Sequence, residues 1–62
     1  MTLARIEQIE DRIKTWREFC WQAYLWMDYK DALAPNMARE YAMCAKRAYD
    51  ALERAIREAR EE

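Results

Sequence analysis

The chain contains no glycine, and its one proline lies just past the middle, in the segment Ala34–Asn36. Glycine and proline interrupt helical patterns more strongly than other residues, so the sequence offers one clear break. Most of the remaining residues favour helix. We therefore predict an all-α antiparallel helical hairpin, with one helix over about residues 3–33, a turn at Ala34–Asn36 and a second helix over about residues 37–60.

The residues at the expected helix ends agree with this division. Thr2 precedes the first helix and can serve as its N-cap, because its hydroxyl can accept a hydrogen bond from a free backbone N–H. The second helix begins either with Pro35 at its first position or with Asn36 as N-cap. A chain of 62 residues is one domain at most, so we predict a single helical-hairpin domain over residues 1–62.

The second helix carries apolar residues at alternating steps of three and four, and most of them are alanines. They are Ala38, Tyr41, Ala45, Ala48, Leu52, Ala55 and Ala59. The first helix carries a stripe of mostly larger side chains, which we expect to face these alanines. The stripe comprises Ile6, Ile9, Ile13, Trp16, Cys20, Ala23, Tyr24 and Met27. Large residues opposite small ones allow two helices to pack closely.

The segment Phe19–Tyr29 holds five aromatic residues, which is more than one side of a helix can accommodate. Trp21, Leu25 and Tyr29 follow at intervals of four, on the side away from the stripe, with Phe19 and Trp26 on a flank. A hairpin cannot cover both sides, and a small domain without metal or disulfide commonly oligomerises. We therefore predict a homodimer in which two hairpins form a four-helix bundle.

We divide the candidate site residues between two surfaces. The expected hairpin and dimer core comprises Ile9, Ile13, Trp16, Phe19, Cys20, Tyr24, Trp26, Met27, Tyr41, Ala45, Ala48 and Leu52. The expected surface for a partner protein comprises Trp21, Leu25, Tyr29, Arg39, Glu40, Met43 and Arg47. Trp, Tyr and Met are enriched in protein interfaces, but the sequence leaves open which aromatics serve the dimer and which serve a partner.

The outer face of the second helix carries a basic stripe that consists of Arg39, Lys46, Arg47, Arg54 and Arg57. Asp50 and Glu53 interrupt it, so we expect a solvated face rather than a phosphate-binding one. In outline, over its whole length, the chain resembles the Rop-type plasmid copy-number proteins, which are dimers of helical hairpins that bind paired RNA loops. The resemblance implies an alternative function, the binding of RNA or DNA through this stripe.

The residues that most enzymes and metal sites require are absent. The chain has no histidine and two cysteines, so we expect no enzymatic activity, no cofactor and no metal. Cys20 and Cys44 do not come opposite each other in the hairpin, because their positions differ by about five residues. We therefore expect both to be reduced, buried side chains of a cytosolic protein.

Charge and composition limit the cellular role. Eleven basic and twelve acidic residues give a net charge of −1, which argues against a dedicated polyanion binder. We expect a cytoplasmic protein without a membrane segment, and the excess of arginine over lysine suggests a bacterial or phage gene. The function that we expect is a small protein-binding regulator: an inhibitor, anti-activator or adaptor. A structural subunit of a larger assembly is a further alternative.

Overall fold

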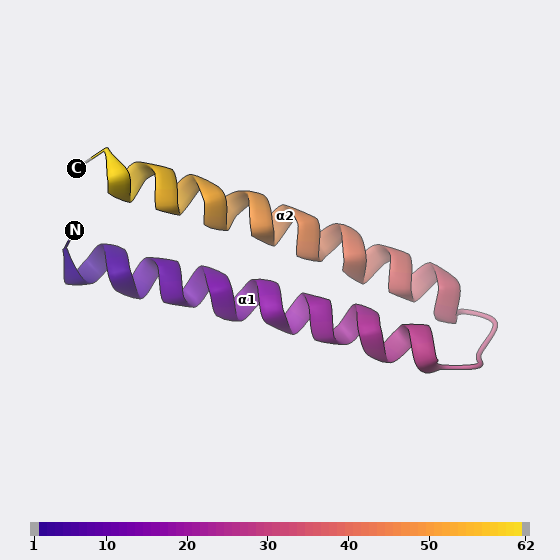
Figure 1. The fold of residues 1–62 in the computed structure, drawn as a ribbon. Helices are drawn as coiled ribbons and strands as arrows, with labels where there is room; N and C mark the ends of the chain where they lie inside the picture. Colours follow the sequence, from indigo (N-terminus) through magenta and orange to yellow (C-terminus); the bar gives the residue numbers. More distant parts are fainter. Residues whose placement is uncertain (1, 62) are drawn as a thin grey trace.

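The computed structural model describes residues 2–61, and it contains two long helices. Helix α1 spans Leu3–Asp28 and helix α2 spans Ala34–Arg60. The two run antiparallel and side by side, so that the start of α1 and the end of α2 lie at the same end (Figure 1). The Cα trace measures 47 × 15 × 10 Å. The predicted helical hairpin is therefore confirmed.

The start of α1 follows the prediction, and its end does not. The Thr2 hydroxyl accepts a hydrogen bond from the backbone N–H of Arg5 at 3.3 Å, as expected of an N-cap. The helix ends at Asp28, five residues before the predicted end at residue 33. Tyr29 is extended, with φ −76° and ψ 140°, and its N–H donates to the Trp26 carbonyl.

Residues 29–33 form the connection, so the predicted turn at Ala34–Asn36 is wrong. The Asp31 carboxylate accepts a hydrogen bond from the N–H of Leu33 at 3.1 Å, and the Asp31 carbonyl accepts one from Ala34. Aspartate side chains that bind nearby backbone in this way compete with helix and favour turns. Pro35 lies in the first turn of α2, where no helical partner for its missing N–H is needed, and Asn36 is not the N-cap.

The contact between the helices rests on small residues of α2. Among residues 2–61 the buried ones are Ala34, Ala45, Leu52, Ala55 and Ala59, each at most 7% exposed, and all belong to α2. The other predicted members of this seam, Ala38, Tyr41 and Ala48, are half-buried. The alanine-rich contact face of α2 is thus confirmed. No residue of α1 is buried, since its larger side chains extend past the alanines and remain partly exposed.

The contact face of α1 is rotated from the predicted stripe. Ile9, Ile13, Trp16 and Ala23 are half-buried as expected, but Ile6, Cys20, Tyr24 and Met27 are exposed. Their places are taken by Phe19 and Trp26, which were expected on a flank.

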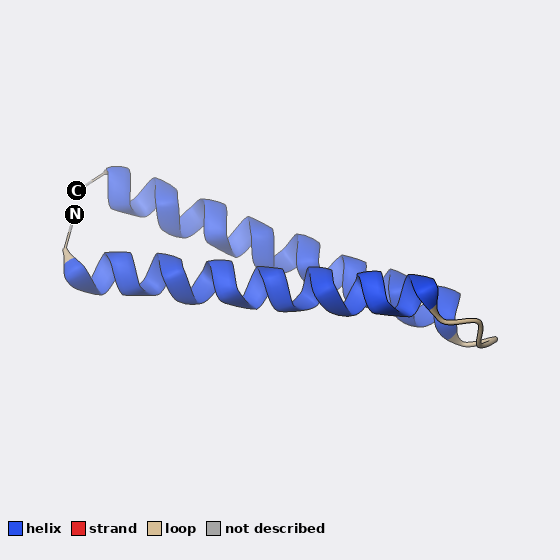
Figure 2. Cartoon of the chain, turned by 60° about the horizontal axis from the view of Figure 1, so that its bottom comes forward, coloured by secondary structure: helices blue, strands red, loops and turns tan. Residues whose placement is uncertain are grey.

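Ring contacts between the helices explain this rotation. The rings of Trp16 and Tyr49 lie 5.5 Å apart between centroids, and those of Phe19 and Tyr41 lie 6.4 Å apart. Aromatic pairs at such distances add stabilisation beyond the area that they bury. The helices cross at a shallow angle (Figure 2), so a fixed stripe on α1 does not follow α2 along its whole length.

Candidate interaction surfaces

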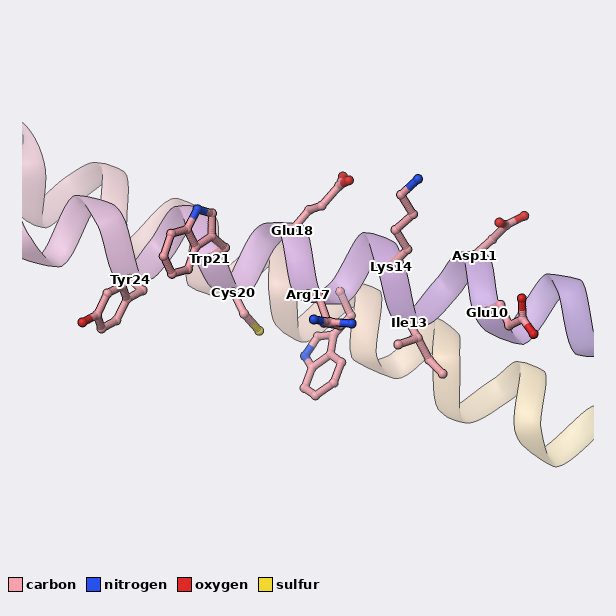
Figure 3. A pocket seen from close by; sticks show the side chains of 10 residues that line it. Glu10, Asp11, Ile13, Lys14, Arg17, Glu18, Cys20, Trp21 and Tyr24 are labelled. Carbon is pink, nitrogen blue, oxygen red and sulfur yellow. The ribbon is translucent and has the colours of Figure 1, made fainter.

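A groove of about 900 Å³ runs along one flank of α1. Its apolar lining comprises Ile13, Trp16, Cys20, Trp21 and Tyr24, and its charged lining comprises Glu10, Asp11, Lys14, Arg17 and Glu18. Ile13, Cys20 and Tyr24 point to one side of α1, whereas Asp11, Lys14 and Glu18 point to the other (Figure 3). We call the side of the hairpin that carries Ile13, Trp16, Cys20 and Tyr24 the groove face.

Helix α2 contributes to the groove face through Tyr49. The Tyr49 side chain is 43% exposed, and its ring contacts Trp16, which lines the groove. Ala42 and Ile56 lie seven residues before and after Tyr49 and therefore share its side of α2. On α1, Ile6 and Met27 lie seven residues beyond Ile13 and Cys20, and they are 40% and 74% exposed. The apolar surface thus extends along most of the hairpin.

The opposite side of the hairpin is polar in the half near the ends of the chain. A smaller hollow of about 220 Å³ lies there, lined by Gln8, Arg12, Ala51, Arg54, Ala55 and Glu58. The Arg5 guanidinium pairs with the Glu58 carboxylate at 3.3 Å between nitrogen and oxygen. We call this side the polar face. It offers charged and amide groups to water and needs no cover.

The outer edge of α1 carries the aromatic residues that were predicted to meet a partner. Trp21 is 58% exposed and Leu25 is 36% exposed. Leu25 lies about 200° around the helix from Ala23, which faces α2, so its side chain points away from the hairpin contact. Tyr29 is 64% exposed but lies beyond the end of α1, so it does not continue the helical row.

Local ring contacts position these outer aromatics. Trp21 stacks on Tyr24 with centroids 5.7 Å apart and an interplanar angle of 17°, which links the outer edge to the groove face. Tyr29 packs against Trp26 with centroids 5.3 Å apart. Two ring pairs therefore join the helices and two are local to α1 and its C-terminal end, a division that the spacing of the aromatics alone did not reveal.

The remaining predicted partner residues lie on the opposite edge of the molecule. Arg39, Glu40, Met43 and Arg47 are all exposed on α2. Met43, 53% exposed, lies about 200° around the helix from the buried Ala45, so it points away from α1. Leu25 and Met43 consequently face in opposite directions. The structure does not bring the seven predicted residues into one surface.

The basic stripe lies on the same outer edge of α2 as Met43. All five of its members, Arg39, Lys46, Arg47, Arg54 and Arg57, are exposed. Asp50 and Glu53 are exposed as well and interrupt the stripe, as the sequence predicted. The edge therefore has mixed charge.

The cysteines differ in their surroundings. Both thiols are free; Cys20 is exposed on the groove face and Cys44 is half-buried. The prediction that Cys20 is buried in the hairpin is wrong, because the rotation of α1 turns this position toward the groove. Cys44 lies seven residues before Ala51, so it belongs to the same flank of α2 as the polar face.

Comparison with protein-family models, curated proteins and solved structures gives no match. Among residues 2–61, no three His, Cys, Asp or Glu side chains are grouped closely enough to hold a metal ion. Neither described helix has an apolar segment of the length that crossing a membrane requires.

Proposed function

We propose that the protein is a small non-enzymatic regulator of the inhibitor, anti-activator or adaptor type, which acts as a homodimeric four-helix bundle and binds another protein. The observation that carries this proposal is the amount of large apolar side chain that the hairpin leaves uncovered. Trp21, Tyr24, Met27 and Tyr29 are each more than half exposed, and they lie within nine consecutive residues. Exposed apolar surface of this extent marks sites of protein interaction.

The homodimer is supported by the surface area of the single chain. The hairpin exposes 5243 Å², whereas a compact protein of its 7.6 kDa mass exposes about 4,300 Å², a surplus of about 900 Å². A standard protein interface covers about 800 Å² on each partner. The buried core, four alanines and one leucine, is also small for a chain of this length. One dimer contact would cover the surplus exposed area and enlarge the buried core.

The partner surface that we propose is the outer edge of α1 near the connection, formed by Trp21, Leu25 and Tyr29. These side chains point away from α2 or lie at the end of α1, so hairpin packing does not occupy them. Large apolar side chains of this kind act as anchors that fill pockets on a partner. We propose that Leu25 and Tyr29 bind the partner and that Trp21 joins this surface to the groove face.

A growth assay tests the partner proposal. The full chain is overproduced in a bacterial host, and its effect on growth is compared with those of the Leu25→Ala and Glu7→Ala variants. Glu7 is exposed on the same outer edge, five turns away, and is the matched control. We expect Leu25→Ala to abolish the effect of the wild-type chain and Glu7→Ala to retain it, with both variants helical by circular dichroism. An unchanged effect of a folded Leu25→Ala variant would reject the proposed surface.

Nucleic-acid binding through α2 is the second candidate. It is favoured by one observation, the presence of five exposed basic residues on the outer edge of that helix. Each phosphate that such a surface neutralises makes binding more sensitive to salt. A gel shift with paired RNA loops at low salt would detect it, and the absence of any shift would exclude it. The interruption by Asp50 and Glu53 makes it the weaker candidate.

A role as a subunit of a larger assembly is the third candidate. It differs from the first in what it predicts for the isolated protein. A permanently covered aromatic surface would leave the purified chain aggregated or without fixed tertiary packing, whereas a regulator is stable as a dimer. Light scattering over a concentration series separates the two.

A further inference from the structure

The groove face carries charged residues at two levels along the hairpin. The Arg5–Glu58 pair and the lining of the polar hollow set the register of the two helices. In this register Glu10 of α1 lies level with Glu53 of α2, and both are exposed carboxylates. Seven residues along α1, about 10.5 Å away, Arg17 lies level with Lys46. The hairpin therefore has an acidic level and a basic level.

All four charged residues border the apolar surface of the groove face. Glu10 and Arg17 line the groove, and they flank Ile13 by three and four residues on α1 (Figure 3). Lys46 and Glu53 flank Tyr49 by three and four residues on α2, which places them on the same side of that helix. Each helix thus carries an apolar residue at the centre with one acid and one base beside it.

The apolar residues between these charges repeat every seven residues on both helices. On α1 the series is Ile6, Ile13, Cys20 and Met27, and on α2 it is Ala42, Tyr49 and Ile56. An apolar repeat of seven is typical of a seam between packed helices. Neither series lies at the centre of the contact between α1 and α2. Ile13, Tyr49 and Ile56 lie at its edge, whereas Ile6, Cys20, Met27 and Ala42 are exposed. Each helix therefore has a second seam that the single chain covers only in part.

Two copies that join through their groove faces can be related by a two-fold axis in two ways. If the axis runs along the helices, α1 packs against α2 of the second copy and residues at the same level meet. Glu10 then faces Glu53, and Arg17 faces Lys46, so that both of these pairs join like charges. Like charges brought together in an interface disfavour the arrangement.

The second arrangement has the axis running across the helices. Helix α1 then packs antiparallel against α1 of the second copy, and α2 packs against α2. An axis midway between the two charge levels places Glu10 beside Arg17 of the second copy and Lys46 beside Glu53 of the second copy. The midpoint between Glu10 and Arg17 and the midpoint between Lys46 and Glu53 lie at the same level of the hairpin, so one axis satisfies both helices.

We infer that the groove face binds a second copy of this chain about a two-fold axis that crosses the hairpin at Ile13 and Tyr49. This inference rests on the homodimer proposed above and specifies its interface. Ile13 and Tyr49 meet their counterparts at the centre. Trp16 comes level with Asp11 of the second copy, and Ile6 comes level with Trp21 of the second copy. At each end Arg39 of one copy comes level with Arg60 of the other, and both exposed side chains can extend into solvent.

The arrangement leaves the proposed partner surface free. In the antiparallel pair, Tyr24 comes level with Leu3 of the second copy, so residues 25–33 extend beyond the end of its α1. Leu25 and Tyr29 are then exposed at both ends of the dimer. Both α1 helices lie on one broad side of the bundle and both α2 helices, with the basic stripe, lie on the other.

Disulfide cross-linking tests the position of the axis. In a Cys20→Ala and Cys44→Ala background, we expect Ile13→Cys and Tyr49→Cys each to give a covalent dimer on mild oxidation, because the two copies of each residue meet at the axis within disulfide reach, about 7 Å between Cα atoms. The wild-type chain is the control. Its two Cys20 residues lie about 20 Å apart along the antiparallel helices, so it stays monomeric on a non-reducing gel. Failure of both variants to cross-link, with helicity retained, would overturn the inference.

A charge reversal separates the two arrangements directly. We expect Glu10→Lys to weaken dimerisation about three- to tenfold, because the introduced ammonium group would meet Arg17 of the second copy in two symmetric contacts. Reversal of both charges, Glu10→Lys with Arg17→Glu, restores the wild-type Kd. With the axis along the helices, the introduced ammonium group would instead meet Glu53 and strengthen the dimer, which would overturn the inference.

The solution mass distinguishes failure of this inference from failure of the proposed function. If Glu10→Lys strengthens the dimer, the proposed homodimer stands and the proposed two-fold arrangement is rejected. A wild-type chain that is monomeric at all concentrations rejects both the homodimer and the interface. In that case the effect of Leu25→Ala on growth still decides whether the chain binds a partner protein.

Discussion

The two side faces of the hairpin are built from the same two helices, yet they differ in chemistry. The groove face presents Ile13, Cys20 and Tyr24 beside a hollow of about 900 Å³. The polar face presents Arg12, Glu58 and neighbouring polar groups around a hollow of about 220 Å³. A helix that contacts one partner needs one apolar stripe. The groove face carries a second apolar surface, and the proposed dimer contact would cover that surface.

The largest expected effect on stability comes from Leu52, which is buried between the two helices. Leu52 is 6% exposed, and within residues 2–61 it is the one large side chain among the buried residues. We expect Leu52→Ala to lower the free energy of unfolding by about 2–3 kcal/mol, through lost burial and a residual cavity. Met43→Ala, an exposed truncation on the same helix, is the control and should change the stability by less than about 0.5 kcal/mol. Chemical denaturation followed by circular dichroism measures both.

The comparison of the faces is tested by placing glutamine at two neighbouring positions. Ile13→Gln exchanges an apolar side chain of the groove face, and Arg12→Gln changes the polar face. We expect Ile13→Gln to reduce stability by about 2 kcal/mol per chain, because the proposed dimer contact would bury the half-buried Ile13 side chain. Arg12→Gln should change it by less than about 0.5 kcal/mol. Thermal unfolding at several protein concentrations measures the difference, and equal effects would contradict the distinction between the faces.

The reactivities of the two cysteines compare the groove face with the flank of the polar face and require no substitution in the core. Cys20 lies on the groove face and Cys44 on the flank of the polar face. If the proposed dimer forms, we expect the alkylation rate of Cys20 to rise at least about tenfold on dilution to the monomer, since the groove-face contact that would cover Cys20 is lost. The rate of Cys44 should stay constant. Mass spectrometry of both sites over a dilution series gives the two rates, and a concentration-independent rate at Cys20 would show that this face stays open.

The smallest expected effect on stability comes from a substitution on the polar face. The Arg5–Glu58 pair is partly exposed, at 32% and 47% of the two side chains. We expect Glu58→Gln to lower stability by at most about 0.5 kcal/mol at low salt, because solvent screens such pairs. The difference should disappear near 1 M salt, where charges interact over about 3 Å. A loss as large as that of Ile13→Gln would mean that the polar face also contributes to a buried contact.

The sequence predicted some elements of the fold and not others, for local reasons. The absence of glycine, the position of Pro35 and the Thr2 cap predicted two helices and the start of the first. The end of α1 was missed by five residues, because Tyr29 to Leu33 have acceptable helix propensities. The connection that follows the helix contains a hydrogen bond from the Leu33 N–H to the Asp31 carboxylate, and such a bond leaves little trace in residue spacing.

The helix surfaces likewise include one that the sequence predicted and one that it did not. The alanine seam of α2 was predicted because one period dominates that helix, whereas α1 is apolar around most of its circumference. On α1 several adjacent stripes have apolar residues at helical spacing, and the predicted one includes Cys20, Tyr24 and Met27. The inter-helix ring pairs of Trp16 and Phe19 select another.

The sequence by itself determined that the chain forms two helices, that α2 packs through alanines and that α1 carries more apolar surface than one contact covers. Each of these follows from local propensity or from the period of a single helix. Only the tertiary structure decided which side of α1 faces α2, which side forms the groove, and that Leu25 and Met43 lie on opposite edges. These depend on the rotation of one helix against the other, and packing between residues distant in sequence sets that rotation.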